Sequence, residues 1–163
     1  MKLTKLFDMQ KALDQHIEQK HQLQEEDLFS RKVLALLVEV GELANETRCF
    51  KFWSVKPSSP KDVILEEFVD GVHFILSLGI ECGFDRQEFE VAVKPSGLNV
   101  TEQFLLLYET IDRFKLDKSF SGFLTVIETY LQLGILLGIS QTEMEQAYLR
   151  KNEVNYQRQA DNY

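Results

Sequence analysis

The amino-acid sequence predicts an all-α protein, a compact bundle of helices. Only three prolines and eight glycines interrupt its 163 residues. Apolar residues recur at spacings of three and four along almost the whole chain, which is the period of an amphipathic helix, and the alternation typical of strands is scarce. A chain of this length can bury a sizeable core, so we expect residues 1–163 to form a single domain.

Three long helices are predicted in the first half of the chain. The first covers about residues 3–22, and the second runs over about residues 27–50. The segment WSVKPSSP then breaks the pattern, and Ser59 followed by Pro60 predicts an N-cap with proline at the first position of a third helix. That helix is expected to end near Cys82. The apolar stripe of the first helix consists of Leu6, Met9, Leu13 and Ile17.

Capping residues predict the remaining helices. Gly83 is expected to close the third helix, and a capping pair then opens a short helix that ends near Pro95. Further helices are expected over about residues 99–114 and 119–137, and a last one from residue 140 to beyond Asn155. The capping pairs are Asp85 with Glu88, Asn99 with Glu102, and Ser140 with Glu143.

The composition excludes several partners. The net charge is −8 and no sustained basic block occurs, so a nucleic-acid partner is not expected. The amino terminus lacks the apolar run of a signal peptide, and no stretch of about 18 uncharged apolar residues could span a membrane. Cys49 and Cys82 are the only cysteines, which fits a reducing compartment. We therefore expect a soluble, cytoplasmic protein.

Two pairs of carboxylates lie inside otherwise apolar segments. Glu39 with Glu42, and Glu67 with Asp70, are each three residues apart, so each pair lies on one helical face. No lysine or arginine occurs in residues 33–47. Four carboxylates gathered between two helices would repel one another, so a cation that prefers oxygen ligands is expected there. Mg²⁺ is the natural candidate.

The sequence leaves two points about these acids open. Each acid could also belong to a solvated acidic face. In addition, Glu66 lies four residues before Asp70, so the inward pair of the third helix contains either Glu66 or Glu67. A di-iron centre is disfavoured, because such sites use Glu-x-x-His pairs and His73 follows an aspartate.

The acids predict a reaction class. Metal ions in a carboxylate cage bind phosphate oxygens, polarise phosphorus and lower the pKa of a bound water. Hydrolysis of a phosphoanhydride requires these effects. The sequence therefore predicts metal-assisted phosphoryl chemistry.

Other residues suit a nucleotide. On the last helix Lys151, Asn155 and Arg158 are spaced by four and three, so they share a face that could hold phosphates and a base edge. Trp53 lies close to Lys51 just after the second helix, where an aromatic ring can wall a base pocket and a lysine can meet phosphate. A solvated last helix and a purely structural tryptophan are the plain alternatives.

These segments together resemble a known family. Glu39-x-x-Glu42, 24 intervening residues and Glu67-x-x-Asp70 are similar to the metal signature of the all-α nucleoside triphosphate pyrophosphatases, which group the MazG-like enzymes with the dimeric dUTPases. FKFWS near the first pair, VDGVHFILSLG at the second and YLRKNEVNYQRQADNY at the end resemble the dimeric all-α dUTPases specifically. The resemblance spans nearly the whole chain and is least distinctive over residues 84–140.

The resemblance implies an activity and its catalytic residues. It implies a four-helix catalytic core that hydrolyses dUTP to dUMP and pyrophosphate, with some activity on dUDP. Glu39, Glu42, Glu67 and Asp70 would then be the catalytic and metal-binding residues, holding two or more Mg²⁺ ions. Glu42 or its neighbour Glu46 would orient the attacking water. A homodimer is also implied.

The resemblance assigns substrate contacts as well. Gln10 matches an amide that these enzymes direct at the base, whereas Asp14 stands where they commonly have asparagine. Phe74 is expected in the core or the pocket wall, and His73 in the core without a role in proton transfer. Tyr163 matches the tyrosine that closes the family's terminal motif, but ADNY lacks the usual glycine before it. The remaining expected contacts are Lys51, Trp53, Lys151, Asn155 and Arg158.

Two other functions stay open on the sequence. A MazG-like pyrophosphatase for another or modified nucleotide, such as dCTP, would keep the acids and differ around Gln10, Asp14 and Asn155. A nucleotide-binding helical protein without turnover would be expected to lack one or more of the four acids, all of which are present.

Overall fold

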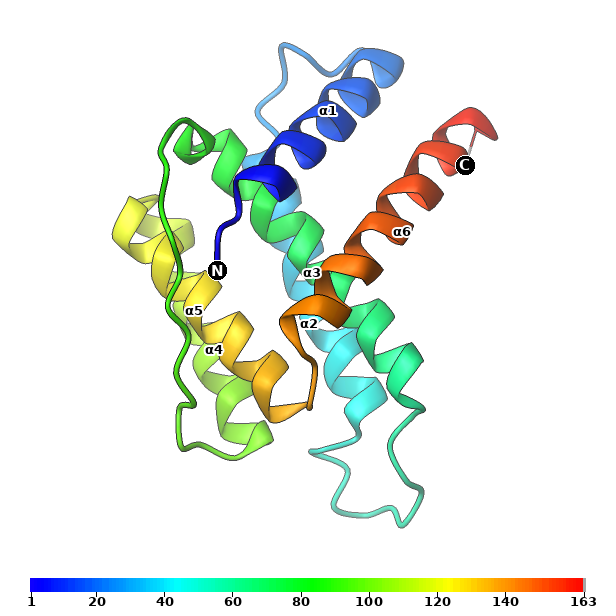
Figure 1. The fold of residues 1–163 in the computed structure, drawn as a ribbon, viewed down its shortest axis with the longest axis vertical. Helices are drawn as coiled ribbons and strands as arrows, with labels where there is room; N and C mark the ends of the chain where they lie inside the picture. The colour runs from blue at the N-terminus through cyan, green and yellow to red at the C-terminus, as the bar shows by residue number, and fades with distance from the viewer. Residues whose placement is uncertain (163) are drawn as a thin grey trace.

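The protein is a bundle of helices, as the sequence predicts (Figure 1). The computed structural model describes residues 1–162, in which the only β-pairing is an isolated bridge between Lys2 and Glu90. The elements are α1 (Thr4–His21), α2 (Phe29–Thr47), α3 (Lys61–Glu81), the short 3-10 helix η1 (Phe84–Arg86), α4 (Val100–Asp117), α5 (Phe120–Leu136) and α6 (Gln141–Ala160).

Helix α3 is the centre of the bundle. It packs against α1, α2, α5 and α6, while α4 and α5 pair with each other and α4 also contacts α2 (Figure 1). Helices α1 and α6 also touch each other, so α1, α2, α3 and α6 form a connected group of four. Residues far apart in the sequence therefore meet along α3.

The core is apolar and draws on every helix. The stripe of α2 is fully buried at Leu36, Val40 and Leu43, each with 0% of its surface exposed. Burying a side chain of this size stabilises the fold by about 1.5–3 kcal/mol relative to leaving it in water. Within the described residues no single helix is long and apolar enough to cross a membrane. Only the pair α5 and α6, bent by 108°, passes that test by length and composition.

Helices α3 and α5 approach each other closely next to Glu67 and Asp70, and this contact fixes the position of α3 there. The hydroxyl of Tyr130, a fully buried residue, donates to the backbone oxygen of Phe68 at 2.7 Å. A Cβ atom on Gly71 would lie 2.0 Å from that hydroxyl oxygen, so only glycine fits there. Because Gly71 directly follows Asp70, this contact sets where Asp70 sits in the bundle.

The predicted short helix after Gly83 is wrong. Gly83 adopts a left-handed backbone (φ +76°), but only one turn of 3-10 helix follows and Gln87 is already extended. The chain then pairs with its own beginning, because Val91 exchanges backbone hydrogen bonds with Met1 in both directions. The carboxylate of Asp85 accepts from Lys11 at 2.6 Å instead of capping a helix. Long-range pairing has overridden the local capping signal.

The predicted helix ends are correct in part. Both capping boxes, Asn99 with Glu102 and Ser140 with Glu143, are present. The Ser59 cap is wrong, because α3 begins at Lys61 without a side-chain cap and the Ser59 hydroxyl donates to Glu46 instead. The second helix is also shorter than the predicted residues 27–50.

Candidate active site

Helices α2 and α3 bring three carboxylates together. Oxygen atoms of Glu39, Glu67 and Asp70 all lie within 4.8 Å of one another, and all three side chains are half-buried. We call these three residues the acid cluster. Glu67 and Asp70 are one turn apart on α3, and Glu39 comes from α2, which packs along it. Two distant segments of the sequence thus converge on one point.

The neighbouring acids lie differently. Glu42 is exposed and lines a surface hollow together with Glu67 and Glu46. Glu66 is also exposed, and it accepts a hydrogen bond from the Lys151 ammonium at 3.1 Å. The structure therefore groups Glu67, and not Glu66, with Glu39 and Asp70.

The acid cluster carries more negative charge than its surroundings neutralise. Burial raises the pKa of Glu39 from 4.5 to about 7, and the charges of Asp70, Glu42 and Glu67 add to this effect. Burial and neighbouring acids also raise the pKa of Glu67. Burial raises the pKa of Asp70 too, although the Lys151 ammonium, 2.8 Å from its carboxylate, opposes that shift.

The chemistry of this donor set fits a hard divalent cation. All the donors are carboxylate oxygens, which Mg²⁺ prefers, and they lie close enough to share one ion. A raised carboxylate pKa means that the charged form lacks a partner, and an ion would supply one. Glu39, Glu67 and Asp70 are the residues that would hold it.

A cavity of about 320 Å³ opens beside the acid cluster. Its volume is that of a small-molecule site, and its polar groups come from α1, α2, α3 and α6. Asp70 and Ser77 both line it, and they are about 10 Å apart along α3 at 1.5 Å per residue. The lining also includes Gln10, Asp14, Lys32, Glu39, His73, Phe74, Asn155, Arg158 and Gln159.

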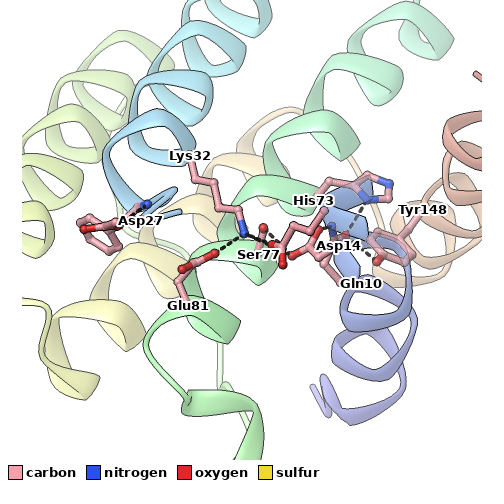
Figure 2. A network of polar contacts seen from close by, with 10 residues as sticks. Gln10, Asp14, Asp27, Lys32, His73, Ser77, Glu81 and Tyr148 are labelled. Atoms are coloured by element: carbon pink, nitrogen blue, oxygen red, sulfur yellow. Dashed lines mark hydrogen bonds and ion pairs between the residues drawn. The ribbon is translucent and has the colours of Figure 1, made fainter. Parts of the chain in front are cut away.

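A buried network of hydrogen bonds lies at the end of this cavity away from the acids, and all of its side chains except Tyr148 line the cavity (Figure 2). Gln10 donates from its amide nitrogen to Asp14 at 2.8 Å. The amide oxygen of Gln10 lies 2.7 Å from Nδ1 of His73 and accepts from the Tyr148 hydroxyl at 2.8 Å. The other carboxylate oxygen of Asp14 accepts from the Ser77 hydroxyl at 2.6 Å. These five side chains, which we call the polar network, join α1, α3 and α6.

The Asp14 carboxylate of the network has a cationic neighbour on α2, Lys32. Lys32 lies 3.7 Å from Asp14 and pairs with Glu81 (Figure 2). It also pairs with Glu18. Burial raises the pKa of Asp14, and the Lys32 ammonium opposes that shift. Burial lowers the pKa of His73 to about 3, so the imidazole is neutral and uses its Nδ1–H as the donor to Gln10. The rings of His73 and Tyr148 stack at 4.2 Å.

The structure brings most of the predicted substrate contacts to this cavity. Gln10, Asp14, Phe74, Asn155 and Arg158 all line it, as do Glu39 and Asp70 of the acid cluster. Lys151 is on the same helix as Asn155 and Arg158, but its ammonium is turned toward Asp70 and Glu66. Its partners are therefore carboxylates.

Two predicted contacts lie elsewhere. Lys51 hydrogen-bonds to Asn45 and stands 5.6 Å from the ring centroid of Phe50. Trp53 is 65% exposed and meets the edges of Phe50 and Phe52 in the loop after α2. Neither residue lines the cavity. Tyr163 lies outside the described residues.

The sequence did not single out two residues of the cavity wall, Lys32 and Ser77, or Tyr148, which contacts Gln10 without lining the cavity. Lys32 and Ser77 both contact Asp14, which the sequence did single out. A signal for Ser77 was present, because it lies seven residues after Asp70 and four after His73, on the same face of α3. Lys32 and Tyr148 carry no such local signal, since they reach the network from other helices.

The fold and the acids define a class, an all-helical hydrolase with a candidate metal centre beside a polar cavity. A family model described as dUTPase matches residues 2–163, almost the whole chain. The chain therefore belongs to the dUTPase family in its all-helical form, and the activity of that family is hydrolysis of dUTP. A search of curated proteins found no match.

Proposed function

We propose that this dUTP diphosphatase is Mg²⁺-dependent and cleaves dUTP to dUMP and pyrophosphate at the acid cluster. The observation that carries the proposal is the meeting of Glu39, Glu67 and Asp70 within 4.8 Å at the edge of the 320 Å³ cavity. Bound Mg²⁺ would bridge phosphate oxygens and lower the pKa of a water molecule. Two or more ions fit the family resemblance.

Residues around the acid cluster would contact the attacking water and the phosphate groups. Glu42 is the better candidate for orienting the attacking water, because Glu46 already accepts from Ser59 and Asn45. Lys151 would exchange its carboxylate partners for phosphate oxygens once metal ions neutralise the acids. Arg158 lines the cavity on the same helix and offers a planar fork for phosphate.

The base would lie toward the polar network. Gln10 and Asn155 present amides to the cavity, and Phe74 offers part of an aromatic face. Because the acids would act on the phosphate chain alone, dUDP is expected to be a second substrate. Lys51 and Trp53 remain proposed contacts that would require the loop after α2 to move or a second subunit to supply them.

A homodimer is proposed on the resemblance and on exposed apolar side chains. Leu34 and Val38 on α2 are 63% and 49% exposed, and Leu105 on α4 is 66% exposed. Helices α2 and α4 pack against each other, so these residues come from adjoining elements. A cytoplasmic location also remains a proposal, supported by two cysteines that are both unpaired.

Pyrophosphate release from a panel of deoxynucleoside triphosphates tests the activity. We expect dUTP to be hydrolysed with Mg²⁺ and not with EDTA, and dCTP and dTTP to be poor substrates. Preferred turnover of dCTP would favour a MazG-like pyrophosphatase with a different base pocket. Equal turnover of dUTP with and without EDTA would contradict the metal centre.

A further inference from the structure

Each of the two helices that carry the acid cluster is bound by a tyrosine hydroxyl from a neighbouring helix. On α3, the hydroxyl of Tyr130 from α5 donates to the backbone oxygen of Phe68 at 2.7 Å. On α2, the hydroxyl of Tyr108 from α4 donates to the backbone oxygen of Leu37 at 3.2 Å. Helices α4 and α5 pack against each other and are joined by a short turn, so both tyrosines belong to one helical hairpin (Figure 1).

The two contacts have the same position relative to an acid of the cluster. Glu39 follows Leu37 by two residues, and Asp70 follows Phe68 by two. At 3.6 residues per turn, two residues correspond to a rotation of about 200°. Each acid therefore lies on nearly the opposite side of its helix from the residue whose carbonyl accepts the tyrosine. The α4–α5 hairpin contacts α2 and α3 on the side away from these two acids.

A glycine beside each contact lets the tyrosine reach the backbone. A Cβ atom on Gly71 would lie 2.0 Å from the Tyr130 hydroxyl oxygen, which is a clash. A Cβ atom on Gly41 would lie 3.3 Å from the Tyr108 hydroxyl oxygen, which is only crowded. Tyr130 is 1% exposed, whereas Tyr108 is half-buried. The contact to α3 is therefore the tighter of the two.

The tight contact also interlocks α3 with α5. The ring of Tyr130 stacks on that of Phe68 with 4.6 Å between the centroids, and a Cβ atom on Gly134 of α5 would lie 2.8 Å from the Phe68 ring. Burial raises the pKa of Tyr130 well above its ordinary value, and the charges of the acid cluster raise it further. The hydroxyl thus stays protonated and remains a donor to α3.

We propose that Tyr130 and Tyr108 are positioning residues for the proposed metal centre, because they tie α3 and α2 to one hairpin and so set the spacing of the acid cluster. This inference rests on the proposed function, since it concerns the carboxylates proposed to hold Mg²⁺. Mg²⁺ requires near-ideal octahedral geometry with oxygens at about 2.0–2.1 Å. The cluster draws its oxygens from two helices, so a small shift of either helix would spoil that geometry.

The test is Tyr130→Phe, which keeps the ring in its place and removes only the donor. Mn²⁺, which takes the same oxygen ligands as Mg²⁺, should bind the nucleotide-free variant about tenfold more weakly by isothermal titration calorimetry. In saturating Mg²⁺, kcat for dUTP should also fall by about tenfold. KM should stay near the wild-type value, because the polar network is untouched.

Tyr108→Phe gives a second, weaker perturbation. Mn²⁺ affinity and kcat should both fall by about threefold, because the hydrogen bond to Leu37 is longer than the one to Phe68. Since Tyr108 is half-buried, this variant decides the question if Tyr130→Phe does not fold.

Ile127→Val is the matched control for lost stability. Ile127 lies one turn before Tyr130 on α5, is 3% exposed and belongs to the same core, but its side chain carries no hydrogen-bonding group. The control should melt at a lower temperature than wild type and keep the wild-type kcat and Mn²⁺ affinity. A tyrosine with a purely structural role would give the same pattern.

Three results would overturn the inference. Wild-type Mn²⁺ affinity and kcat in folded Tyr130→Phe, or in Tyr108→Phe if the first variant does not fold, would show that these hydroxyls do not set the acids. Equal losses in Ile127→Val would indicate a general effect of a loosened core. A wild-type protein that hydrolyses dUTP without binding Mn²⁺ would refute the metal centre of the proposed function, and the inference with it.

Discussion

The two ends of the cavity satisfy their polar groups in opposite ways. In the acid cluster, Glu39, Glu67 and Asp70 face one another, burial raises the pKa of each, and repulsion from other acids of the cluster adds to the shifts of Glu39 and Glu67. In the polar network, the Gln10 amide and the Asp14 carboxylate have protein partners at 2.6–2.8 Å. The acids of one end face one another, whereas the amide oxygen of Gln10 and both carboxylate oxygens of Asp14 at the other end accept hydrogen bonds from the protein. Among the described residues only Nε2 of His73 in that network has no partner.

Both ends are built on the same helix. Along α3, Asp70 belongs to the acid cluster, while His73 and Ser77, one and two turns further on, belong to the polar network. A rigid helix therefore fixes the distance between the proposed site of phosphate chemistry and the proposed site of the base. Such rigidity favours catalysis because it holds reacting groups in register.

The largest expected effect comes from removing one acid of the cluster. Glu67→Gln keeps the shape and deletes a charge proposed to hold metal, so kcat for dUTP should fall by about 10²–10³-fold. The melting temperature should stay the same or rise, because repulsion with Glu39 and Asp70 is relieved. Steady-state pyrophosphate release and thermal unfolding measure the two effects. Glu128→Gln, an exposed acid of α5, is the control, and a Glu67→Gln enzyme with the wild-type rate would refute the assignment.

A smaller effect is expected from the lysine that pairs with the acids. Lys151 is 9% exposed, and Lys151→Met would leave the half-buried Asp70 without its 2.8 Å partner. The metal-free free energy of unfolding should fall by about 1–2 kcal/mol, less than for a fully buried pair because Asp70 remains partly solvated. Mg²⁺ should restore part of the loss.

Urea denaturation with and without Mg²⁺ measures this change. Lys115→Met provides the comparison, because Lys115 pairs with Asp112 on the surface and such pairs contribute about 0–1 kcal/mol. If the two variants lose the same stability, the acid cluster does not depend on Lys151 for neutralisation.

The smallest expected effect is a change of metal-free stability with pH. The pKa of Glu39 is about 7 in the folded protein and 4.5 in the unfolded chain, so between these values the folded state holds more protons. Its contribution to metal-free stability is therefore greatest below pH 4.5, falls as the pH rises to about 7 and is constant above. The difference in melting temperature between wild type and Glu39→Gln should follow this curve, and saturating Mg²⁺ should flatten it. A difference that does not vary with pH would contradict the raised pKa.

The sequence predicted the helices well where local signals agree with packing. The two capping boxes at Asn99 and Ser140 form as expected, because each pairs a short polar side chain with a glutamate three residues on. The caps predicted at Asp85 and Ser59 do not form. Asp85 accepts a hydrogen bond from Lys11 instead, and the Ser59 hydroxyl donates to Glu46. Capping contributes only about 1 kcal/mol, so one competing contact can override it.

For the candidate site, the sequence supplied residues, and folding determined which of them meet. Helical spacing alone put Glu67 and Asp70 on one face, but the choice of Glu67 over Glu66 depends on how α2 and α6 pack against α3. Position along the chain likewise could not show that Lys51 and Trp53 lie away from the cavity.

The sequence by itself determined an all-helical chain with two acidic pairs, because helical period and side-chain charge are local properties of consecutive residues. Only the tertiary structure decided that Gln10, Asp14, His73 and Tyr148 share one network, since these side chains come from three helices as far as 138 residues apart. Hydrogen bonding is short-ranged and directional. Its partners are therefore fixed by the packing of helices and not by their order along the chain.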